Sequence, residues 1–261
     1  MATAEARHYQ DVHELPVVFA NKKTGKVYWS EVFENNPKII QEPKPGQKVV
    51  VVENYPGRRP YITLVTKERY HYNNNFFIEA GEIFLSEEEE RRGIDGAVLI
   101  EPNTKTEMGL SRNKAWPWER WQALVDTVKA PWVQMGPSGS RRLNGVRFVE
   151  TPRFRDTFPY INKARLIVTT DGAIHHASAA LEKKAVVLWG GVASPDLLGY
   201  RTHINIAHED LPCGSIIDCA HCKAAMERIT VEEVADAIQR VLIGRSQEGR
   251  SPEGVCEGVS G

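Results

Sequence analysis

The chain has 261 residues, a formal net charge of −1 at pH 7 and 41% hydrophobic residues. That length fits one large domain or two small ones, and the apolar content is enough to form a core. The nearly neutral charge gives no electrostatic basis for tight non-specific binding of nucleic acid or of an anionic membrane, although a DNA substrate is not excluded.

Both ends of the chain are polar. Residues 1–15 carry no apolar stretch of the kind found in signal peptides, and we predict a flexible arm there. Residues 246–261 are rich in glycine, serine and glutamate, and we predict a disordered tail. No apolar run approaches 18 residues, which predicts a cytoplasmic protein without membrane insertion.

Residues 16–95 show short strand patterns and are predicted to form a small α/β domain. The clearest pattern, residues 48–53, runs into a turn that contains Arg58 and Arg59. Two guanidinium groups at a strand end suit a phosphate or a carboxylate, and the alternative is a pair of solvated surface arginines. Glu53 lies at the same strand end.

Residues 96–245 alternate apolar strand-like runs with helical patterns about five times. This alternation predicts a parallel, doubly wound sheet, with the domain boundary at Gly93–Gly96. The predicted strands cover residues 97–100, 132–135, 146–149, 166–168, 185–189 and 204–206.

A candidate anion site lies in the middle of this second part. Residues 164–192 read as strand, turn, helix and strand, with Asp171 and Gly172 in the turn and His175 and His176 in the first helical turn. A helix N-terminus at the carboxyl edge of a parallel sheet presents free N–H groups to an anion, so we interpret the turn as a nucleotide-binding turn. The alternative is that Asp171 only caps the helix.

Lys114 is a second candidate for contact with a phosphate group. It follows the strand at residues 97–100 and precedes a helix that Pro117 is suited to begin. A cation in that position lies where a ligand phosphate would meet the sheet edge.

Three of the four cysteines, Cys213, Cys219 and Cys222, fall within ten residues, and His221 lies between the last two. Three thiolates and an imidazole suit a tetrahedral metal such as zinc, although the spacing is irregular. A structural thiol cluster without metal is the alternative, and disulfides are less favoured in a cytoplasmic protein.

The second part resembles the nucleotide-sugar-binding domain of the ADP-heptose:lipopolysaccharide heptosyltransferase family, which are inverting glycosyltransferases with the GT-B fold. Residues 114–121 (KAWPWERW) resemble the family's Lys-x-Trp-Pro-x-x-x-Trp/Phe element. Residues 171–181 resemble its Asp-x-Gly-x-x-His-x-Ala-Ala-Ala-Leu element. Gly190 and residues 213–234 resemble its glycine turn and Cys-rich loop. The first part matches only loosely, so the resemblance implies a GT-B-like α/β fold with a reduced N-terminal domain.

The resemblance also implies roles for individual residues. Lys114 would contact the donor diphosphate, and Asp171 would accept hydrogen bonds from sugar or ribose hydroxyls. Gapless alignment places the family histidine at His176, which would donate to the phosphate. The other predicted donor-binding residues are Thr104, Gly172, His175 and Gly190.

The acceptor side departs from the family pattern. Relatives carry a Gly-Asp loop whose aspartate is the proposed base, whereas here Gly57 is followed by Arg58. Glu53 is therefore our candidate base, and Arg58 or Arg59 would bind an anionic acceptor or the diphosphate. Ala225 stands where relatives often carry a fourth cysteine, which makes a complete metal site less favoured.

The leading hypothesis is a metal-independent glycosyltransferase that uses an ADP- or UDP-sugar. No cofactor is required for transfer, and the Cys-rich loop is a candidate site for structural zinc or iron. The acceptor is left open between a surface glycan of the lipopolysaccharide type and a hydroxymethylated base in phage DNA or a free nucleotide. The alternatives are a catalytically silent relative that binds a nucleotide or a partner, and a metal-sensing or structural thiol module. The oligomeric state stays open.

Overall fold

The computed structural model describes residues 1–55, 57–103, 112–208 and 212–248. Its first segment, residues 1–95, contains α1 (Ala2–His13), β1 (Val17–Phe19), η1 (Glu31–Phe33), β2 (Val50–Val52), β3 (Ile62–Val65), β4 (Tyr70–Tyr72) and α2 (Glu87–Arg91). None of the helices in the described ranges combines the length and the apolar character that a membrane crossing requires.

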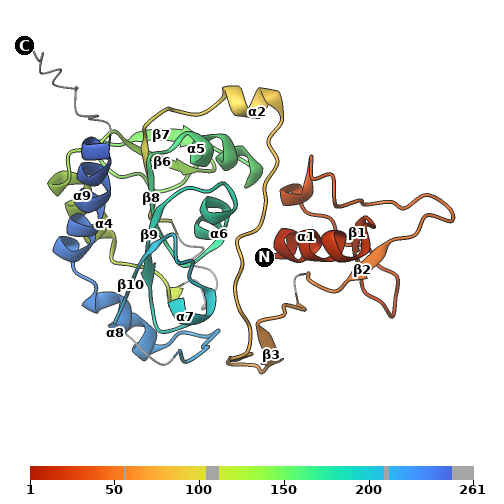
Figure 1. The fold of residues 1–261 in the computed structure, drawn as a ribbon. Coiled ribbons are helices and arrows are strands. Elements are labelled where there is room, and N and C mark those ends of the chain that lie inside the picture. The colour runs from red at the N-terminus through yellow and green to blue at the C-terminus, as the bar shows by residue number, and fades with distance from the viewer. Residues whose placement is uncertain (56, 104–111, 209–211, 249–261) are drawn as a thin grey trace, which may run out of the picture.

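The second segment, residues 96–248, is a doubly wound α/β unit (Figure 1). Its elements are β5 (Val98–Glu101), α4 (Trp118–Thr127), β6 (Trp132–Gly136), β7 (Arg147–Glu150), η2 (Arg155–Thr157), α5 (Phe158–Lys163), β8 (Leu166–Thr170), α6 (Ala173–Ala180), β9 (Ala185–Trp189), α7 (Pro195–Leu198), β10 (Ile204–Ala207), α8 (Ala220–Arg228) and α9 (Val231–Glu248). All six predicted strands are confirmed.

The six strands form one parallel sheet in the order β10-β9-β8-β5-β6-β7. The chain runs outward from β5 through β6 to β7, and then returns to β8 and continues outward on the other side. The strand order therefore reverses between β5 and β8. In open parallel sheets, the crevice at the carboxyl ends of the strands at such a reversal is the usual ligand position.

Alternate side chains of the central strands pack on opposite faces of the sheet, as expected for strands buried on both sides. Val98 and Leu166 join a cluster with α4 and α9 on one face. Leu99 and Ile167 join a second cluster with α5 and α6 on the other face. Figure 1 shows these two helical layers on either side of the sheet.

The first segment begins with a helix, so the prediction of a flexible arm over residues 1–15 is wrong. In α1, Thr3, Ala4 and Ala6 are buried, and the Thr3 hydroxyl oxygen accepts a hydrogen bond from the Glu82 amide. These buried side chains are small, which is why no apolar periodicity reveals the helix. Helix α1 packs on β1 and β2, which pair in parallel.

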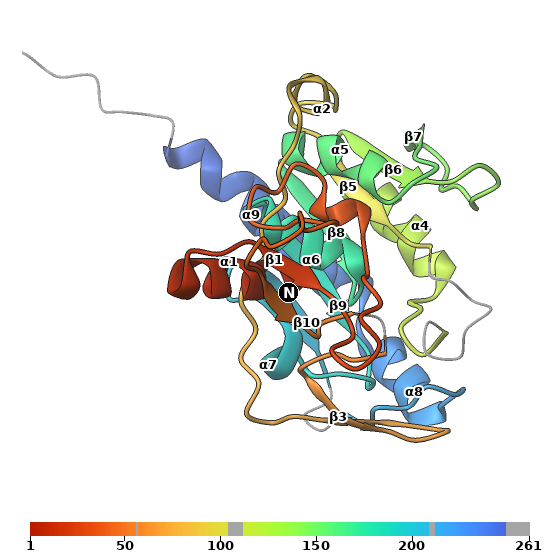
Figure 2. The same ribbon diagram turned by 90° about the vertical axis from the view of Figure 1, so that its right-hand side faces the viewer.

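The later part of the first segment packs on the second segment. Strands β3 and β4 form an antiparallel hairpin, and Tyr61, Ile62 and Tyr72 contribute to the apolar cluster that contains α5 and α6. In Figures 1 and 2 the first segment lies against the side of the sheet that carries α6. The division between residues 95 and 96 remains our proposal for the boundary between the two domains.

Arg155 joins the two segments from inside the protein. Its side chain is almost fully buried and pairs with Glu89 at 2.6 Å and with Glu34 at 3.1 Å. It also donates to the backbone carbonyls of Glu31 and Phe84. These partners come from the first segment, so one guanidinium group connects the first segment to the second.

The final helix extends into the predicted tail. Helix α9 continues to Glu248, although we expected the disordered tail to begin at residue 246. The rest of the predicted tail, with Cys256, lies outside the described residues.

Candidate functional site

Lys114 and Asp171 meet at the reversal of strand order. Lys114 follows β5 and Asp171 follows β8, and the parallel pairing of these two strands brings their carboxyl ends together. The Lys114 ammonium donates to Oδ2 of Asp171 at 2.5 Å, and only 5% of the Asp171 side chain is exposed. The sequence predicted both residues, and the structure brings them together.

The charge of Lys114 controls the ionisation of Asp171. Burial alone would raise the pKa of this carboxyl group. The neighbouring ammonium group, with a smaller contribution from His175, outweighs burial and lowers the pKa below its usual value. Asp171 is therefore an anion at neutral pH, able to accept hydrogen bonds from hydroxyl groups.

Asn113 fixes the position of Lys114, and sequence reasoning missed it. Its buried side chain donates to the carbonyl of Ile217 at 2.6 Å and accepts from the amide of Cys219 at 2.9 Å. These bonds tie the residue before Lys114 to the Cys-rich loop. A buried asparagine adjoining a candidate lysine is a weak sequence signal, because its partners lie about a hundred positions away.

His175 is a structural residue in this geometry, and its ring has no nitrogen left for the predicted contact with the donor. The ring is fully buried; Nδ1 accepts from the Gly172 amide at 3.1 Å, and Nε2 donates to the carbonyl of Leu198 at 3.2 Å. Backbone groups thus occupy both ring nitrogens, which corrects the assignment of His175 to the donor. Burial lowers the pKa of His175, so the ring is neutral and stabilises the turn before α6.

His176 points to a different environment. Its Nδ1 lies 2.9 Å from the hydroxyl group of Tyr200, and the residue lines a cavity of about 420 Å³ between α6 and the first segment. Burial, and then the proximity of His175, hold the pKa of His176 well below its usual value. His176 is thus a neutral imidazole beside a cavity, and its contact with the donor stays a prediction.

The two predicted glycines differ in their surroundings. Gly172 precedes α6, and its amide is the group bound by His175. A Cβ at Gly190 would lie 2.7 Å from the carbonyl oxygen of Asn113, so close packing against the residue before Lys114 explains the glycine. Thr104 lies outside the described residues.

The predicted acceptor residues line a second cavity, of about 730 Å³, in the first segment. Glu53 Oε2 pairs with the Nε of Arg58 at 3.3 Å, and Glu53 Oε1 accepts from the Lys22 amide. Arg59 donates to the hydroxyl of Tyr61 and lines both cavities. The structure thus groups Glu53, Arg58 and Arg59 together, next to the cavity of His176.

Glu101 is a further acidic residue at the sheet edge that sequence reasoning missed. It ends β5 opposite Thr169 of β8, and its carboxyl group accepts from the amide of Asn103. Burial raises the pKa of Glu101 to about 8. The signal available in the sequence was a charged residue at the end of an otherwise apolar strand.

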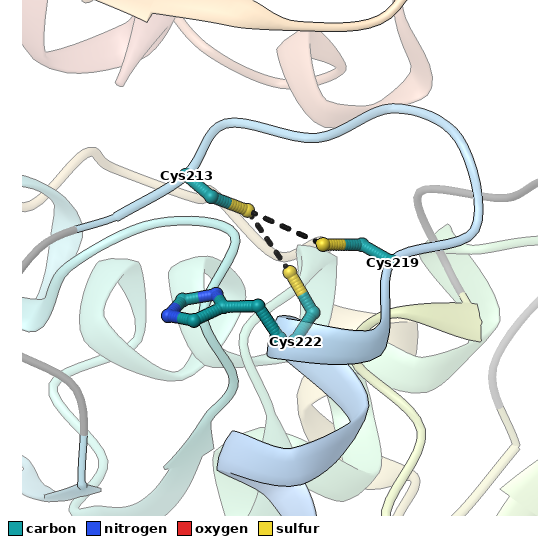
Figure 3. A group of neighbouring side chains, drawn as sticks. Cys213, Cys219 and Cys222 are labelled. Carbon is teal, nitrogen blue, oxygen red and sulfur yellow. Dashed lines mark hydrogen bonds between the residues drawn. The ribbon is translucent and has the colours of Figure 1, made fainter.

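The Cys-rich loop forms a compact cluster (Figure 3). The Cys213 sulfur lies 3.1 Å from that of Cys222 and 3.9 Å from that of Cys219. One ligand atom from each of these cysteines and from His221 falls within 4.8 Å of the others. In a tetrahedral site with metal–sulfur bonds of about 2.3 Å, sulfur atoms lie roughly 3.8 Å apart. The Cys213–Cys219 separation matches this value and the Cys213–Cys222 separation is shorter, while three thiols and an imidazole are the donor types that a tetrahedral metal takes.

The cluster is connected to both segments. The Cys213 amide donates to the carbonyl of Gly191, and a Cβ at Gly191 would lie 2.6 Å from the His221 ring. Beyond the cluster, Tyr70 of β4 donates to Gly214, and Ile216 donates to Glu68. The loop therefore binds the β3–β4 hairpin through its backbone.

Comparison with solved structures identifies similar folds. The iron-containing dodecameric glycosyltransferase TibC from enterotoxigenic E. coli H10407 matches with a TM-score of 0.50 and 13% identity, over 70% of this chain and 53% of that chain. TibC in complex with ADP-D-β-D-heptose matches with a TM-score of 0.48 and 12% identity, over 70% and 52%. The E. coli ADP-heptose LPS heptosyltransferase II matches with a TM-score of 0.49 and 18% identity, over 64% and 54%.

The chain spans about half the length of these structures. No family model and no curated protein matches the sequence. The predicted fold class is confirmed: the six-stranded parallel sheet and its helical layers are the α/β arrangement of a GT-B-like glycosyltransferase such as TibC.

Proposed function

We propose that this protein is a glycosyltransferase that takes a sugar from a nucleoside-diphosphate donor, an ADP- or UDP-sugar, and transfers it to a hydroxyl group of an acceptor. The observation that carries the proposal is the Lys114–Asp171 pair at the start of α6, where β5 and β8 end together. The cation and the helix N-terminus suit the diphosphate of such a donor, and the carboxylate suits a hydroxyl group of its sugar or ribose.

Each residue of the site has its own role in the proposed transfer. The acceptor oxygen attacks the anomeric carbon, and the bond from that carbon to the diphosphate breaks with its electron pair leaving on the phosphate oxygen. Lys114 and the N-terminus of α6 stabilise the charge that develops there. Asp171 holds a sugar or ribose hydroxyl, and His176 donates to the phosphate. Glu53 is our candidate base for the acceptor proton.

The fold shared with TibC supports the proposal, as does the resemblance of residues 114–121 and 171–181 to the heptosyltransferase elements. We keep both acceptor classes, a glycan of the lipopolysaccharide type and a hydroxymethylated base. The metal-independent mechanism also remains part of the proposal, since Lys114 and α6 supply positive charge at the leaving group.

Incubation with ADP-glucose, UDP-glucose and ADP-heptose tests the function. We expect steady release of ADP or UDP from at least one donor, and loss of that release in Lys114→Met. Lys184→Met is the matched control, because Lys184 is exposed on the turn after α6. Binding of the nucleotides without any release would instead identify a catalytically silent relative.

A structural metal at Cys213, Cys219, Cys222 and His221 is a second proposal, supported by the four ligand atoms within 4.8 Å. His221 takes the place of the fourth cysteine that the sequence lacks at Ala225. When bound, the metal would fix the loop that contacts Asn113 and the β3–β4 hairpin. TibC is described as iron-containing, so we favour iron or zinc. Elemental analysis of the purified protein, with Cys213→Ser as the control, tests this proposal.

A further inference from the structure

The cavity between α6 and the first segment is lined by small side chains of the helix on one side and by aromatic side chains on the other. Its floor is one stripe of α6, formed by Ala173, His176, Ala177 and Ala180. These positions are spaced three and four residues apart, so they lie on the same face of the helix. Three alanines leave the space above the helix open, and Ala173 continues directly from Gly172 and Asp171 of the donor site.

The opposite walls of this cavity are aromatic. Tyr28 stacks on Tyr55 with ring centroids 4.0 Å apart and an angle of 7° between the planes. Trp29 packs edge-on against Phe33, and 40% of its surface is exposed. Tyr61 lines the cavity as well. Tyr61 belongs to the apolar cluster that includes Ile174 and Ala177, so this wall packs with the helix that follows Asp171.

The charge of the lining is low. Among the described residues that line the cavity, Arg59 has the only charged side chain at neutral pH, and it already donates to the Tyr61 hydroxyl at 3.0 Å. The adjoining cavity of about 730 Å³ contains Glu5, Glu53, Lys22 and Arg58 instead. Charged groups of a ligand would therefore find partners in the second cavity and few in the first, where unpaired charge is costly to bury.

Because an alanine stripe faces aromatic walls with little charge, we propose that the cavity lined by Trp29 and Ala180 binds the acceptor. The acceptor presents a flat, uncharged ring that bears the attacking hydroxyl group, and it is not a phosphorylated sugar. This inference rests on the proposed function and names the acceptor class for the same site. A flat ring gains stacking contacts with aromatic walls, and the volume of about 420 Å³ is within the range of small-molecule sites.

Binding of simple probes to the full chain without donor tests the inference. The ring probes are benzyl alcohol and 5-hydroxymethyl-2′-deoxyuridine, the sugar probe is methyl α-D-glucoside, and binding is followed by saturation-transfer NMR titration. We expect both ring probes to bind and the glucoside to bind at least about tenfold more weakly, the order of factor that a single stacking contact supplies.

Two variants locate the binding. Trp29→Ala removes part of the wall and should weaken ring binding about tenfold or more. Ala180→Leu narrows the cavity and should abolish it. The matched control is Ala224→Leu on an exposed position of α8, which should bind as the wild type does. Equal binding of the glucoside, or ring binding unchanged in both cavity variants, would overturn the inference.

A titration with ADP on the same samples separates the two proposals. If ADP binds and the ring probes do not, the acceptor class is wrong and the proposed transferase stands. If neither binds, both proposals fail. If the ring probes bind but ADP does not, the cavity is a ligand site without a donor and the acceptor assignment is overturned.

Discussion

The Lys114 ammonium and the Asp171 carboxylate, 57 positions apart in sequence, form a 2.5 Å ion pair at the carboxyl edge of the sheet. The pair is mostly shielded from solvent, with 19% of the Lys114 side chain and 5% of the Asp171 side chain exposed. Because the ammonium can bind both a carboxylate and a phosphate, it is placed to share its hydrogen bonds with an incoming diphosphate.

Lys114→Met should weaken ADP binding by about 10- to 150-fold, the range for a lost hydrogen bond to a charged group. The isosteric methionine keeps the packing of the side chain and removes its charge. Isothermal titration calorimetry measures the affinity, with Lys184→Met as the control. Equal ADP affinity in Lys114→Met and wild type would remove this lysine from the donor site.

The two adjacent histidines should respond differently to substitution. His176→Ala should lower turnover about 10²-fold with the fold retained, since a donor to the leaving group is lost. His175→Ala should lower the free energy of unfolding, by about 1–3 kcal/mol for each buried backbone group left without a partner. Donor turnover and urea unfolding, measured on both variants, separate the roles. The reverse pattern would exchange the assignments.

Arg155→Ala should lower the free energy of unfolding by about 3–5 kcal/mol, because Glu89 and two backbone carbonyls would lose a buried partner. Urea unfolding followed by circular dichroism measures it. Arg153→Ala is the control, since 61% of the Arg153 side chain is exposed, and the stability of this variant should stay close to wild type. Similar losses in both variants would contradict the role of Arg155 as the connection between the segments.

Acid should remove the stabilisation that Glu89 provides. Burial alone would raise the pKa of Glu89, but the hydrogen bond from Arg155 and that from Ser86 outweigh burial and lower it. A lowered folded pKa means that the stabilisation is complete above the unfolded value, about 4.3, and is lost as the pH falls through the folded value. The stability difference between wild type and Glu89→Gln should therefore be present at pH 7 and shrink below about pH 4. A difference independent of pH would show that the charge of Glu89 is not involved.

Removal of the proposed metal should loosen the contact between the Cys-rich loop and the β3–β4 hairpin. Treatment with a chelator should speed hydrogen exchange at the Tyr70 and Ile216 amides, which bond across this contact. Cys222→Ser should show the same fast exchange without a chelator. Slow exchange in both conditions would mean that the loop holds its shape without metal.

The sequence alone determined the second segment to a large extent. Six strand-like runs could be recognised, of which residues 166–168 and 185–189 are buried on both faces. Their alternation with helical patterns leaves few arrangements other than a parallel sheet. Lys114, Asp171 and the His175–His176 pair could be chosen because each follows a strand or opens a helix. At those positions the local sequence pattern was enough to predict where the residue lies in the fold.

Only the tertiary structure decided the rest, because those features depend on partners that are remote in the chain. Helix α1 is held by small residues against β1 and β2, which no periodicity signals. The choice between His175 and His176 depends on the backbone groups of Gly172 and Leu198 that occupy one ring. The aromatic cavity likewise exists only where the first segment meets α6. Such contacts form between residues that are far apart in the chain, so a short-range sequence pattern does not predict them.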